Sequence, residues 1–397
     1  ICEFKKKKYF RKEDMMSRPI SVDRLKNRID KNEKDIKDIK EKIEKKKKRP
    51  EIKNGKYNYD LRKAIRTPNF KNKTVLTDTT AEYVLTYLQG KKASEETIFY
   101  WQQAMNFYEA TQLLDIFSAP LTTYYCFLNA TKSLLDYKGV HFDFKHGVSG
   151  SRKKGRAVLQ NEIVKFHPSG VLAGLGEYYQ QKPQKTESYN LKDLLYNLPY
   201  IHRAYTMVYS NQPELFIPIY NPRFVYDPCR NKKNGWFEAE LEEEYSDNKS
   251  LKQLKGYSMD RYYINKNNYV IRRNKQFDWE CSRNKPEEKS IKSFEKYYYK
   301  IRKNVDYIYS PNELWYLKRN DLNNSSIIDK NTLIITMGAM HRLSELARYY
   351  PLILKSHLEK EQGWLLREFI NKSIVQFIDA IASEITGDDF RQTGFRN

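Results

Sequence analysis

Residues 120–135 read Pro-Leu-Thr-Thr-Tyr-Tyr-Cys-Phe-Leu-Asn-Ala-Thr-Lys-Ser-Leu-Leu, a stretch with a single charged side chain. Proline is favoured at the start of a helix, because its missing N–H is one that the first turn leaves unpaired anyway. A helix that is apolar on nearly every side lies in the interior of its domain. The stretch therefore predicts a central, buried helix around which the rest of the main domain is built.

Other segments show the periodicity of helices. Ser-Glu-Glu-Thr at 94–97 precedes an apolar face and predicts a helix that begins at Ser94 with two acidic residues in its first turn. Gly387 predicts the end of the last helix. Further helices are predicted over residues 190–208, 333–354, 364–370 and 374–385.

Residues 210–330 carry short runs rich in Tyr, Phe, Trp, Val and Ile, separated by polar turns, which is typical of short strands. The predicted fold class is mainly α: a helical core split by a smaller β-rich insert, with an N-terminal basic coiled-coil arm. The predicted domains are the arm at 1–50, a linker at 51–90, a helical region at 91–209, the β-rich insert at 210–330 and a C-terminal helical region at 331–397.

The arm holds a heptad pattern over residues 22–46. Branched apolar residues recur seven apart at 22, 29, 36 and 43, with Leu25, Asn32 and Ile39 at the d positions. All other positions are polar or charged, so only this seam can be buried. The pattern predicts docking to a second copy or to a protein partner; a single solvated helix is the alternative.

The net charge of +22 is concentrated in the N-terminal part of the chain. Residues 1–75 hold 27 Lys and Arg against 12 Asp and Glu, whereas the other 322 residues carry a net charge of only +7. This distribution favours RNA or DNA as partners, and a charge that serves only solubility is the alternative. No apolar run approaches the roughly 20 residues of a membrane-spanning helix, so no membrane partner is predicted.

The cysteines stand at positions 2, 126, 229 and 281 and form no C-x-x-C pair. Their spacing matches neither a zinc site nor a disulfide framework. No apolar segment of the kind found in secretory signals follows the first lysines. These features predict a cytoplasmic protein.

Two basic segments are candidates for phosphate contact. Gly147–Arg156 combines three glycines with Arg152, Lys153, Lys154 and Arg156, and predicts a flexible loop whose amides and cations contact phosphate. Its spacing is not that of a P-loop, and a solvated surface turn is the alternative. The second segment consists of Lys45, Lys46, Lys47 and Lys48 at the end of the arm.

Six histidines limit the search for acid/base chemistry. His341 is followed by Arg342 and, one helical turn later, by Glu345, so an imidazole has a cation and an orienting carboxylate beside it. His202 joins this set only if its helix packs against that of His341. The candidate catalytic residues are therefore His341, Arg342, Glu345 and His202, with ordinary hydrogen-bonded histidines as the alternative.

No metal site and no cofactor are predicted. His141 and His146 stand in a segment that alternates with Phe, and side chains five residues apart on an extended chain point to opposite faces. The two imidazoles are therefore not expected to share a metal ion.

Residues 101–110, 120–135 and 141–147 resemble the YaaC-like family of bacterial proteins, as do His341–Pro351, Trp364–Ile370 and Gln376-Phe377. The likeness covers roughly residues 98–387. The resemblance implies a mostly helical protein with a two-helix core similar to HEPN domains. Many HEPN proteins are RNases of toxin or antiphage systems that cut through an R-x(4–6)-H motif, and no histidine of this chain has an Arg at that spacing.

Three functions remain open on the sequence. The first is a nucleic-acid-associated subunit of a bacterial defence or stress system, which binds the phosphate backbone through its arm and loop and docks through its coiled coil. The second is a metal-independent RNase of HEPN-like type. The third is a non-enzymatic scaffold. The first is favoured because no acid/base set has the spacing of a known catalytic motif.

Overall fold

The computed structural model describes residues 30–34, 49–71, 74–227, 234–263, 269–282, 285–310, 314–322 and 326–391. The chain divides into two compact units, Ile1–Pro50 and Glu51–Asn397. In the first unit residues 30–34 are helical. Most of the predicted coiled coil over 22–46, and all of Lys45–Lys48, lie outside the described residues, so both remain predictions.

Helices form much of the second unit, and two of the predicted helix ends are confirmed. The Ser94 side chain accepts a hydrogen bond from the Thr97 N–H, and Gly387 ends the last helix with a left-handed backbone (φ +80°). None of the helices that the structure describes has the length and apolar character needed to cross a membrane. The helices are α2 (Thr80–Gly90), α3 (Glu95–Gln112), α4 (Ala119–Tyr137), α5 (Val171–Tyr178), α6 (Leu191–Tyr196), α7 (His202–Val208), α8 (Asn248–Lys252), α9 (Glu288–Arg302), α10 (Thr332–Tyr349), α11 (Pro351–Leu358) and α12 (Gly363–Thr386).

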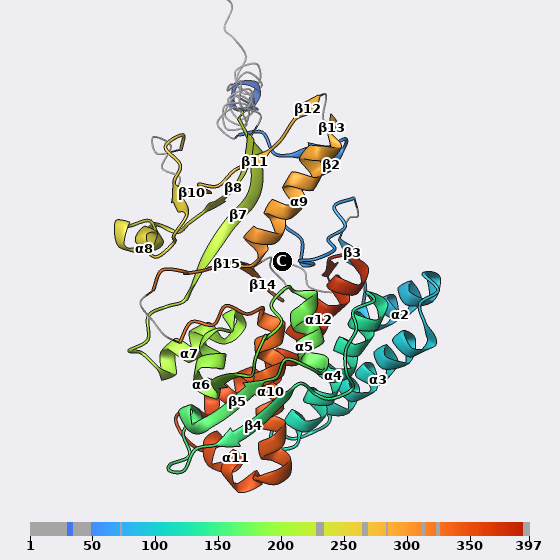
Figure 1. Cartoon of the computed structure of the whole chain (residues 1–397). Helices are drawn as coiled ribbons and strands as arrows, with labels where there is room; N and C mark the ends of the chain where they lie inside the picture. Colours follow the sequence, from blue (N-terminus) through green and yellow to red (C-terminus); the bar gives the residue numbers. More distant parts are fainter. Residues whose placement is uncertain are drawn as a thin grey trace, which may run out of the picture. The chain divides into compact units, whose positions relative to one another are not determined.

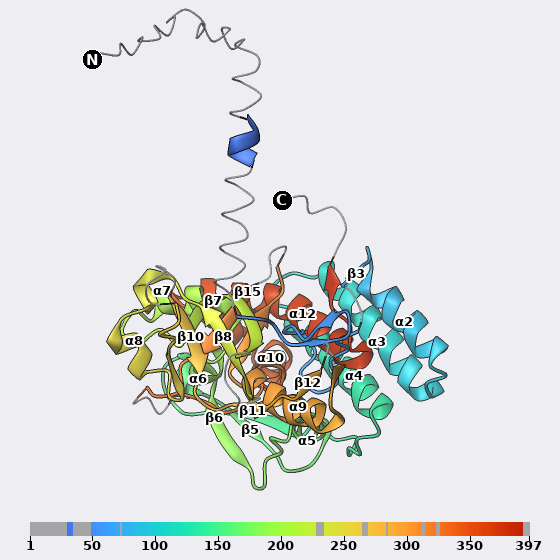
Figure 2. The same cartoon turned by 90° about the horizontal axis from the view of Figure 1, so that it is seen from above.

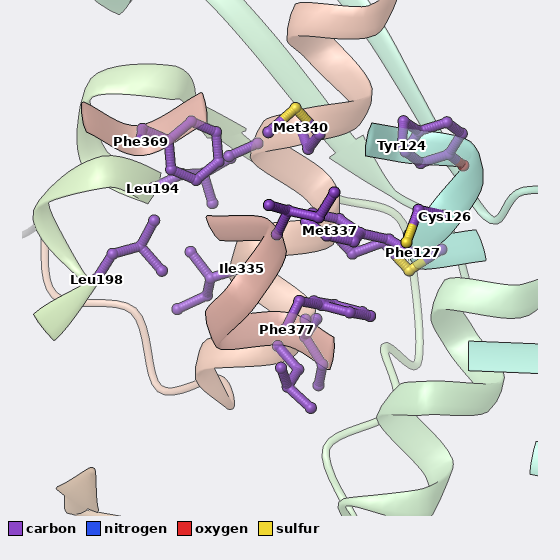
Figure 3. Packing of buried hydrophobic residues seen from close by; sticks show 14 of the residues in the cluster. Tyr124, Cys126, Phe127, Leu194, Leu198, Ile335, Met337, Met340, Phe369 and Phe377 are labelled. Atoms are coloured by element: carbon purple, nitrogen blue, oxygen red, sulfur yellow. The ribbon is translucent and has the colours of Figure 1, made fainter. Parts of the chain in front are cut away.

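Helix α4 is buried along most of its length, as the apolar stretch at 120–135 predicts. It packs against α3, α10 and α12. Figure 3 shows this core from close by, with Phe127 of α4, Met337 of α10 and Phe377 of α12 among the labelled side chains. The rings of Phe127 and Phe377 stack with their centroids 4.1 Å apart.

The expectation of a mainly helical fold with a small β-rich insert is wrong. Seven strands form one antiparallel sheet in the order β14-β15-β7-β8-β10-β9, with β11 also paired to β8. In both views the labelled strands β7, β8 and β10 lie to the left of α2, α3 and α4 (Figures 1 and 2). The strands are β7 (Phe216–Tyr226), β8 (Asn234–Glu240), β9 (Tyr257–Met259), β10 (Val270–Arg273), β11 (Phe277–Asp278), β14 (Val305–Ile308) and β15 (Leu314–Lys318).

The large sheet has a hydrophobic core of its own. Phe224 of β7 and Phe237 of β8 pack with Phe294 and Tyr298 of α9 in a cluster separate from the one around α4. A bulge between Tyr220 and Arg223 interrupts the pairing with β8, and β7 nevertheless continues from Phe216 to Tyr226. A sheet with its own buried side chains and a covering helix is a structural layer, not an insert in a helical core.

The segment at 51–90, expected to be a linker, is built into the second unit. Ile52 and Tyr59 are buried in the core of the large sheet, and the Ile52 N–H donates to the Phe224 carbonyl. Besides α2 it contains β1 (Lys53–Asn54), β2 (Tyr57–Asn58) and β3 (Val75–Leu76). Strand β3 pairs in parallel with β16 (Phe390–Arg391), and β12 (Cys281–Ser282) pairs with β13 (Lys285–Pro286).

A three-stranded antiparallel sheet lies against α10 (Figure 1). It consists of β4 (Val148–Arg152), β5 (Glu162–Phe166) and β6 (Glu187–Asn190). The first half of the predicted flexible loop is therefore a strand. The approach of sheet and helix is close, since a Cβ atom on Gly338 would lie 2.3 Å from the Phe166 ring.

Candidate functional site

The β4–β6 sheet separates its carboxylates from its exposed cations. Directly paired residues of an antiparallel sheet lie on the same face, and successive residues alternate between faces. Ser149, Lys165 and Ser188 are paired across the three strands, and Lys165 and Ser188 are exposed. Glu162 and Glu187 belong to the opposite face, which is turned toward α10. The outer face of this sheet consequently carries no carboxylate.

On the inner face, Glu162 is fully buried and contacts two guanidinium groups and one imidazole. Its carboxylate lies 2.8 Å from Arg342 Nη2, 3.0 Å from His357 Nε2 and 3.2 Å from Arg152 Nε. Burial alone raises the pKa of Glu162, but the hydrogen bonds from His357 and Arg342 and the charge of Arg342 lower it below its ordinary value. Glu162 is therefore ionised and joins β5 to β4, α10 and α11.

The four cations predicted to contact phosphate fall into two groups, one engaged within the protein and one exposed. Arg152 is engaged, because it pairs with Glu162 and donates from Nη2 to the Gly155 carbonyl at 3.0 Å. Lys153, Lys154 and Arg156 lie in the turn between β4 and β5 and are exposed. We call these three residues the basic turn.

Two backbone N–H groups of this segment have partners within the protein. The Gly150 N–H donates to Glu345 Oε1 at 3.0 Å, and the Lys153 N–H donates to the Asn161 carbonyl. A Cβ atom on residue 150 would lie 1.8 Å from Glu345 Oε2, so the small residue makes room for that carboxylate. The N–H groups of Gly150 and Lys153 are therefore engaged within the protein, whereas the side chains of the basic turn are exposed.

Two of the predicted catalytic residues are part of the same buried network. Arg342 is 2% exposed and lies between Glu162 and Glu345, with its Nη1 atom 2.8 Å from Glu345 Oε2. Its guanidinium is fully engaged by carboxylates. Arg342 and Glu345 thus hold α10 against β4 and β5.

His202 does not join His341. It lies on α7, packs against Tyr196 and Phe216, and accepts a hydrogen bond at Nε2 from the Leu215 N–H at 3.0 Å. Burial lowers the pKa of His202 to about 3, so the imidazole is neutral near pH 7. These contacts are those of a histidine in a domain core.

His341 instead meets aromatic residues and a second histidine. Its ring centroid lies 4.8 Å from that of Tyr124 on α4 and 5.8 Å from that of His146, in the loop before β4. His146 Nδ1 and the Tyr124 hydroxyl are 2.9 Å apart. Arg348, one helical turn beyond Glu345, donates from Nη2 to the Tyr125 hydroxyl at 3.1 Å. We call Tyr124, Tyr125, His146, His341 and Arg348 the histidine cluster.

Both imidazoles of the cluster are held neutral. Burial, and after it the charges of His146, Arg342 and Arg348, lower the pKa of His341 to about 3. Burial and the charges of Lys132 and Arg348 also lower the pKa of His146. Each imidazole is therefore neutral near pH 7, with one nitrogen that donates and one that accepts a hydrogen bond.

A third histidine lies on the outer face of the small sheet. Ser149 Oγ is 2.8 Å from His167 Nε2, and Thr186 Oγ1 is 3.3 Å from His167 Nδ1. The sequence does not predict His146 or His167 as acid/base groups, because their partners are far away in the chain. No group of three or more potential metal ligands occurs among the described residues.

Comparison with known proteins gives one match. Residues 84–385 match the model of the family described as YaaC-like Protein, which confirms the resemblance found in the sequence. No curated protein and no solved structure matches the chain.

Proposed function

The chain belongs to the YaaC-like family, and from the surface described above we propose that it binds nucleic acid through the β4–β6 sheet. The observation that carries the proposal is the separation of charge in that sheet. The exposed cations lie in the basic turn and at Lys165, and the carboxylates are turned inward.

The inward carboxylates do not cancel the outer charge. Glu162 is neutralised by Arg342 and Arg152, and Glu187 by Lys330 at 3.1 Å. Lys153, Lys154, Arg156 and Lys165 therefore form a positive surface on a rigid support. Lysine and arginine side chains that release counterions from phosphates supply most of the affinity in such binding.

The neighbouring hydroxyl groups suit the same ligand. Ser149, Ser151 and Ser188 share the outer face with Lys165, and small hydroxyl side chains commonly donate hydrogen bonds to phosphate and sugar oxygens. The contact by Lys45–Lys48 and the docking of residues 22–46 to a partner remain predictions from the sequence, as does a role in defence.

The proposal is tested by the salt dependence of binding to a fluorescently labelled single-stranded RNA. We expect the logarithm of the binding constant to fall linearly with the logarithm of salt concentration for the wild-type protein. Reversal of the charges of the basic turn by Lys153→Glu, Lys154→Glu and Arg156→Glu should weaken binding. It should also reduce the magnitude of the slope of log binding constant against log salt concentration by about 2, since each phosphate contact on a single strand contributes about 0.7.

A matched control is available around α8. Lys249, Lys252 and Lys255 are also exposed, and their reversal to Glu changes the net charge by the same amount. Equal loss of affinity in both triple variants would mean that only net charge matters and would contradict a site on the β4–β6 sheet. Salt-independent binding, or no binding, would refute the proposed function.

A further inference from the structure

A cavity of about 570 Å³ lies between α9 and the chain segment that precedes β3. Its volume is within the range of about 300–1,000 Å³ that is typical of small-molecule sites. Residues of the segments 65–70 and 295–300 line it, together with Gln180. None of these lining residues belongs to the β4–β6 sheet, so this cavity, which we call the α9 cavity, is separate from the proposed nucleic-acid surface.

Cations outnumber carboxylates around the α9 cavity. Arg66 lines one wall, and Lys296 and Lys300 line the other, one helical turn apart on α9. The described lining includes one carboxylate, that of Glu295. No carboxylate of the described residues pairs with any of the three cations, whereas Lys292, one turn earlier on α9, has a carboxylate at 2.6 Å. Three cations that are not neutralised by the protein favour an anionic ligand.

The same cavity also has planar groups in its walls. Phe70 and Tyr299 line it, and neither is fully buried. The Arg66 guanidinium lies over the Tyr299 ring, with its central carbon 4.7 Å from the ring centroid. Nucleobases stack both on aromatic rings and on arginine guanidinium planes. Planar and cationic groups around one cavity therefore suit a ligand that combines a base with phosphates.

The two walls are held in place by contacts outside the cavity. The N–H groups of Ile65 and Arg66 donate to the carboxylate of Glu384 on α12, at 2.7 and 3.2 Å. The Arg62 N–H donates to the Tyr298 hydroxyl of α9 at 3.1 Å. The cavity is therefore formed without a ligand, which spares the ligand the cost of ordering its site.

Gln180, two residues after α5, lines the cavity with an unusual backbone. Its φ of +55° lies in the left-handed region, where residues other than glycine are uncommon and are often part of functional sites. The preceding Tyr179 carbonyl accepts a hydrogen bond from the Tyr299 hydroxyl, which ties this turn to α9. The Gln180 side chain is exposed and makes no hydrogen bond to the described residues. Its amide, with donor and acceptor, is able to pair with the polar edge of a base.

We propose that the α9 cavity binds a nucleoside diphosphate or triphosphate. Lys296 and Lys300 contact the phosphates. The base stacks against Phe70 and the Arg66 guanidinium, and Gln180 contacts its edge. This inference goes beyond the proposed function, because the ligand is a free nucleotide and the residues that hold it lie on other elements.

The test is isothermal titration calorimetry of the full chain in EDTA with the diphosphates of adenosine, guanosine, cytidine and uridine. We expect at least one of the four to bind at least 10-fold more tightly than its nucleoside and than inorganic pyrophosphate, because the cavity contacts both parts of the ligand. Pyrophosphate that binds as tightly as the nucleotides would show a site for anions alone and would overturn the proposal.

The phosphate contacts are tested by a double variant with a matched control. Lys296→Gln combined with Lys300→Gln should weaken nucleotide binding at least 10-fold. Lys289→Gln combined with Lys292→Gln removes the same charge from exposed positions of the same helix that do not line the cavity, so it should bind like the wild type. Gln180→Gly should weaken binding and leave the fold intact, since glycine readily adopts a left-handed backbone.

The variant with the reversed basic turn separates this inference from the proposed function. It should bind the nucleotide like the wild type, although its affinity for RNA falls. Loss of nucleotide binding in that variant would place the ligand on the β4–β6 sheet and overturn the inference. Absence of binding of all four diphosphates, or equal losses in the two double variants, overturns it as well, and each of these outcomes leaves the RNA-binding proposal standing.

Discussion

Glu162 is the residue on which the candidate surface depends most. It is fully buried, yet it carries the negative charge that neutralises Arg342 and Arg152 and accepts a hydrogen bond from His357. Burial of a single unpaired charge is far more costly than burial of a pair. The position of β4, and with it the basic turn, therefore rests on one carboxylate.

We expect Glu162→Gln to lower the free energy of unfolding by about 3 kcal/mol, since it leaves the Arg342 guanidinium buried with only Glu345 to balance it. Urea denaturation followed by circular dichroism measures the change. Glu109→Gln, at an exposed site on α3, removes the same charge and should change stability by less than about 0.5 kcal/mol. Equal stability of the two variants would mean that the buried network contributes nothing.

At the same scale, the sequence predicts only those site residues that are near one another in the chain. His341, Arg342 and Glu345 are within one turn of a helix, so their grouping is visible in the sequence. The contact between His146 and His341 joins residues 195 positions apart and depends on how the loop before β4 packs on α4 and α10. No local pattern encodes such a contact, and without aligned relatives no covariation reveals it.

At the scale of elements, the close contact between α10 and β5 is set by a glycine. Gly338 lies in the middle of α10, where glycine costs about 1 kcal/mol relative to alanine. Its missing side chain lets the Phe166 ring approach to a distance that a Cβ atom would not allow. A residue with low helix propensity therefore occupies this position because the packing of α10 on β5 requires it.

We therefore expect Gly338→Ala to destabilise the protein by about 1–3 kcal/mol, although alanine is the better helix former, because the Phe166 ring has to move. Gly90→Ala is the control: no atom lies within 4 Å of the added methyl group, so this variant should be as stable as the wild type or slightly more so. Urea denaturation of both variants and of the wild type measures the free energies of unfolding that test this expectation. A stabilised Gly338→Ala variant would show that the helix and the sheet are not packed so tightly.

The same elements explain which parts of the fold the sequence predicts. Helix α4 is predicted because its apolar run is long, and Ser94 and Gly387 are predicted because capping is a local interaction. Strand β4 is missed because Ser-Gly-Ser at 149–151 has low strand propensity, and its pairing with β5 and its packing on α10 override that propensity.

At the scale of the whole molecule, two hydrophobic cores decide the fold class. One surrounds α4, and the other lies between the large sheet and α9. The short strands of residues 216–318 suggest a small insert when they are considered one at a time. They form a seven-stranded sheet because distant segments, including Ile52 and Tyr59, complete a common core, and such assembly is not visible in local patterns.

The buried histidines make the stability of the second unit depend on pH. The pKa of His202 and that of His341 are each lowered to about 3 in the folded protein, whereas an unfolded chain has the ordinary value near 6.5. The unfolded state therefore binds more protons at acid pH. The stabilisation is complete above pH 6.5 and is lost as the pH falls from 6.5 toward 3, with Glu162 adding to the loss below about pH 4.5.

We expect the free energy of unfolding in urea to decrease by up to about 2 kcal/mol for each of these two histidines between pH 7 and pH 5. His202→Gln retains an acceptor for the Leu215 N–H but does not titrate, so it should remove about half of this pH dependence. His141→Gln, at an exposed site, should leave it unchanged. A free energy that is constant from pH 7 to pH 5 would mean that both imidazoles become protonated in the folded protein.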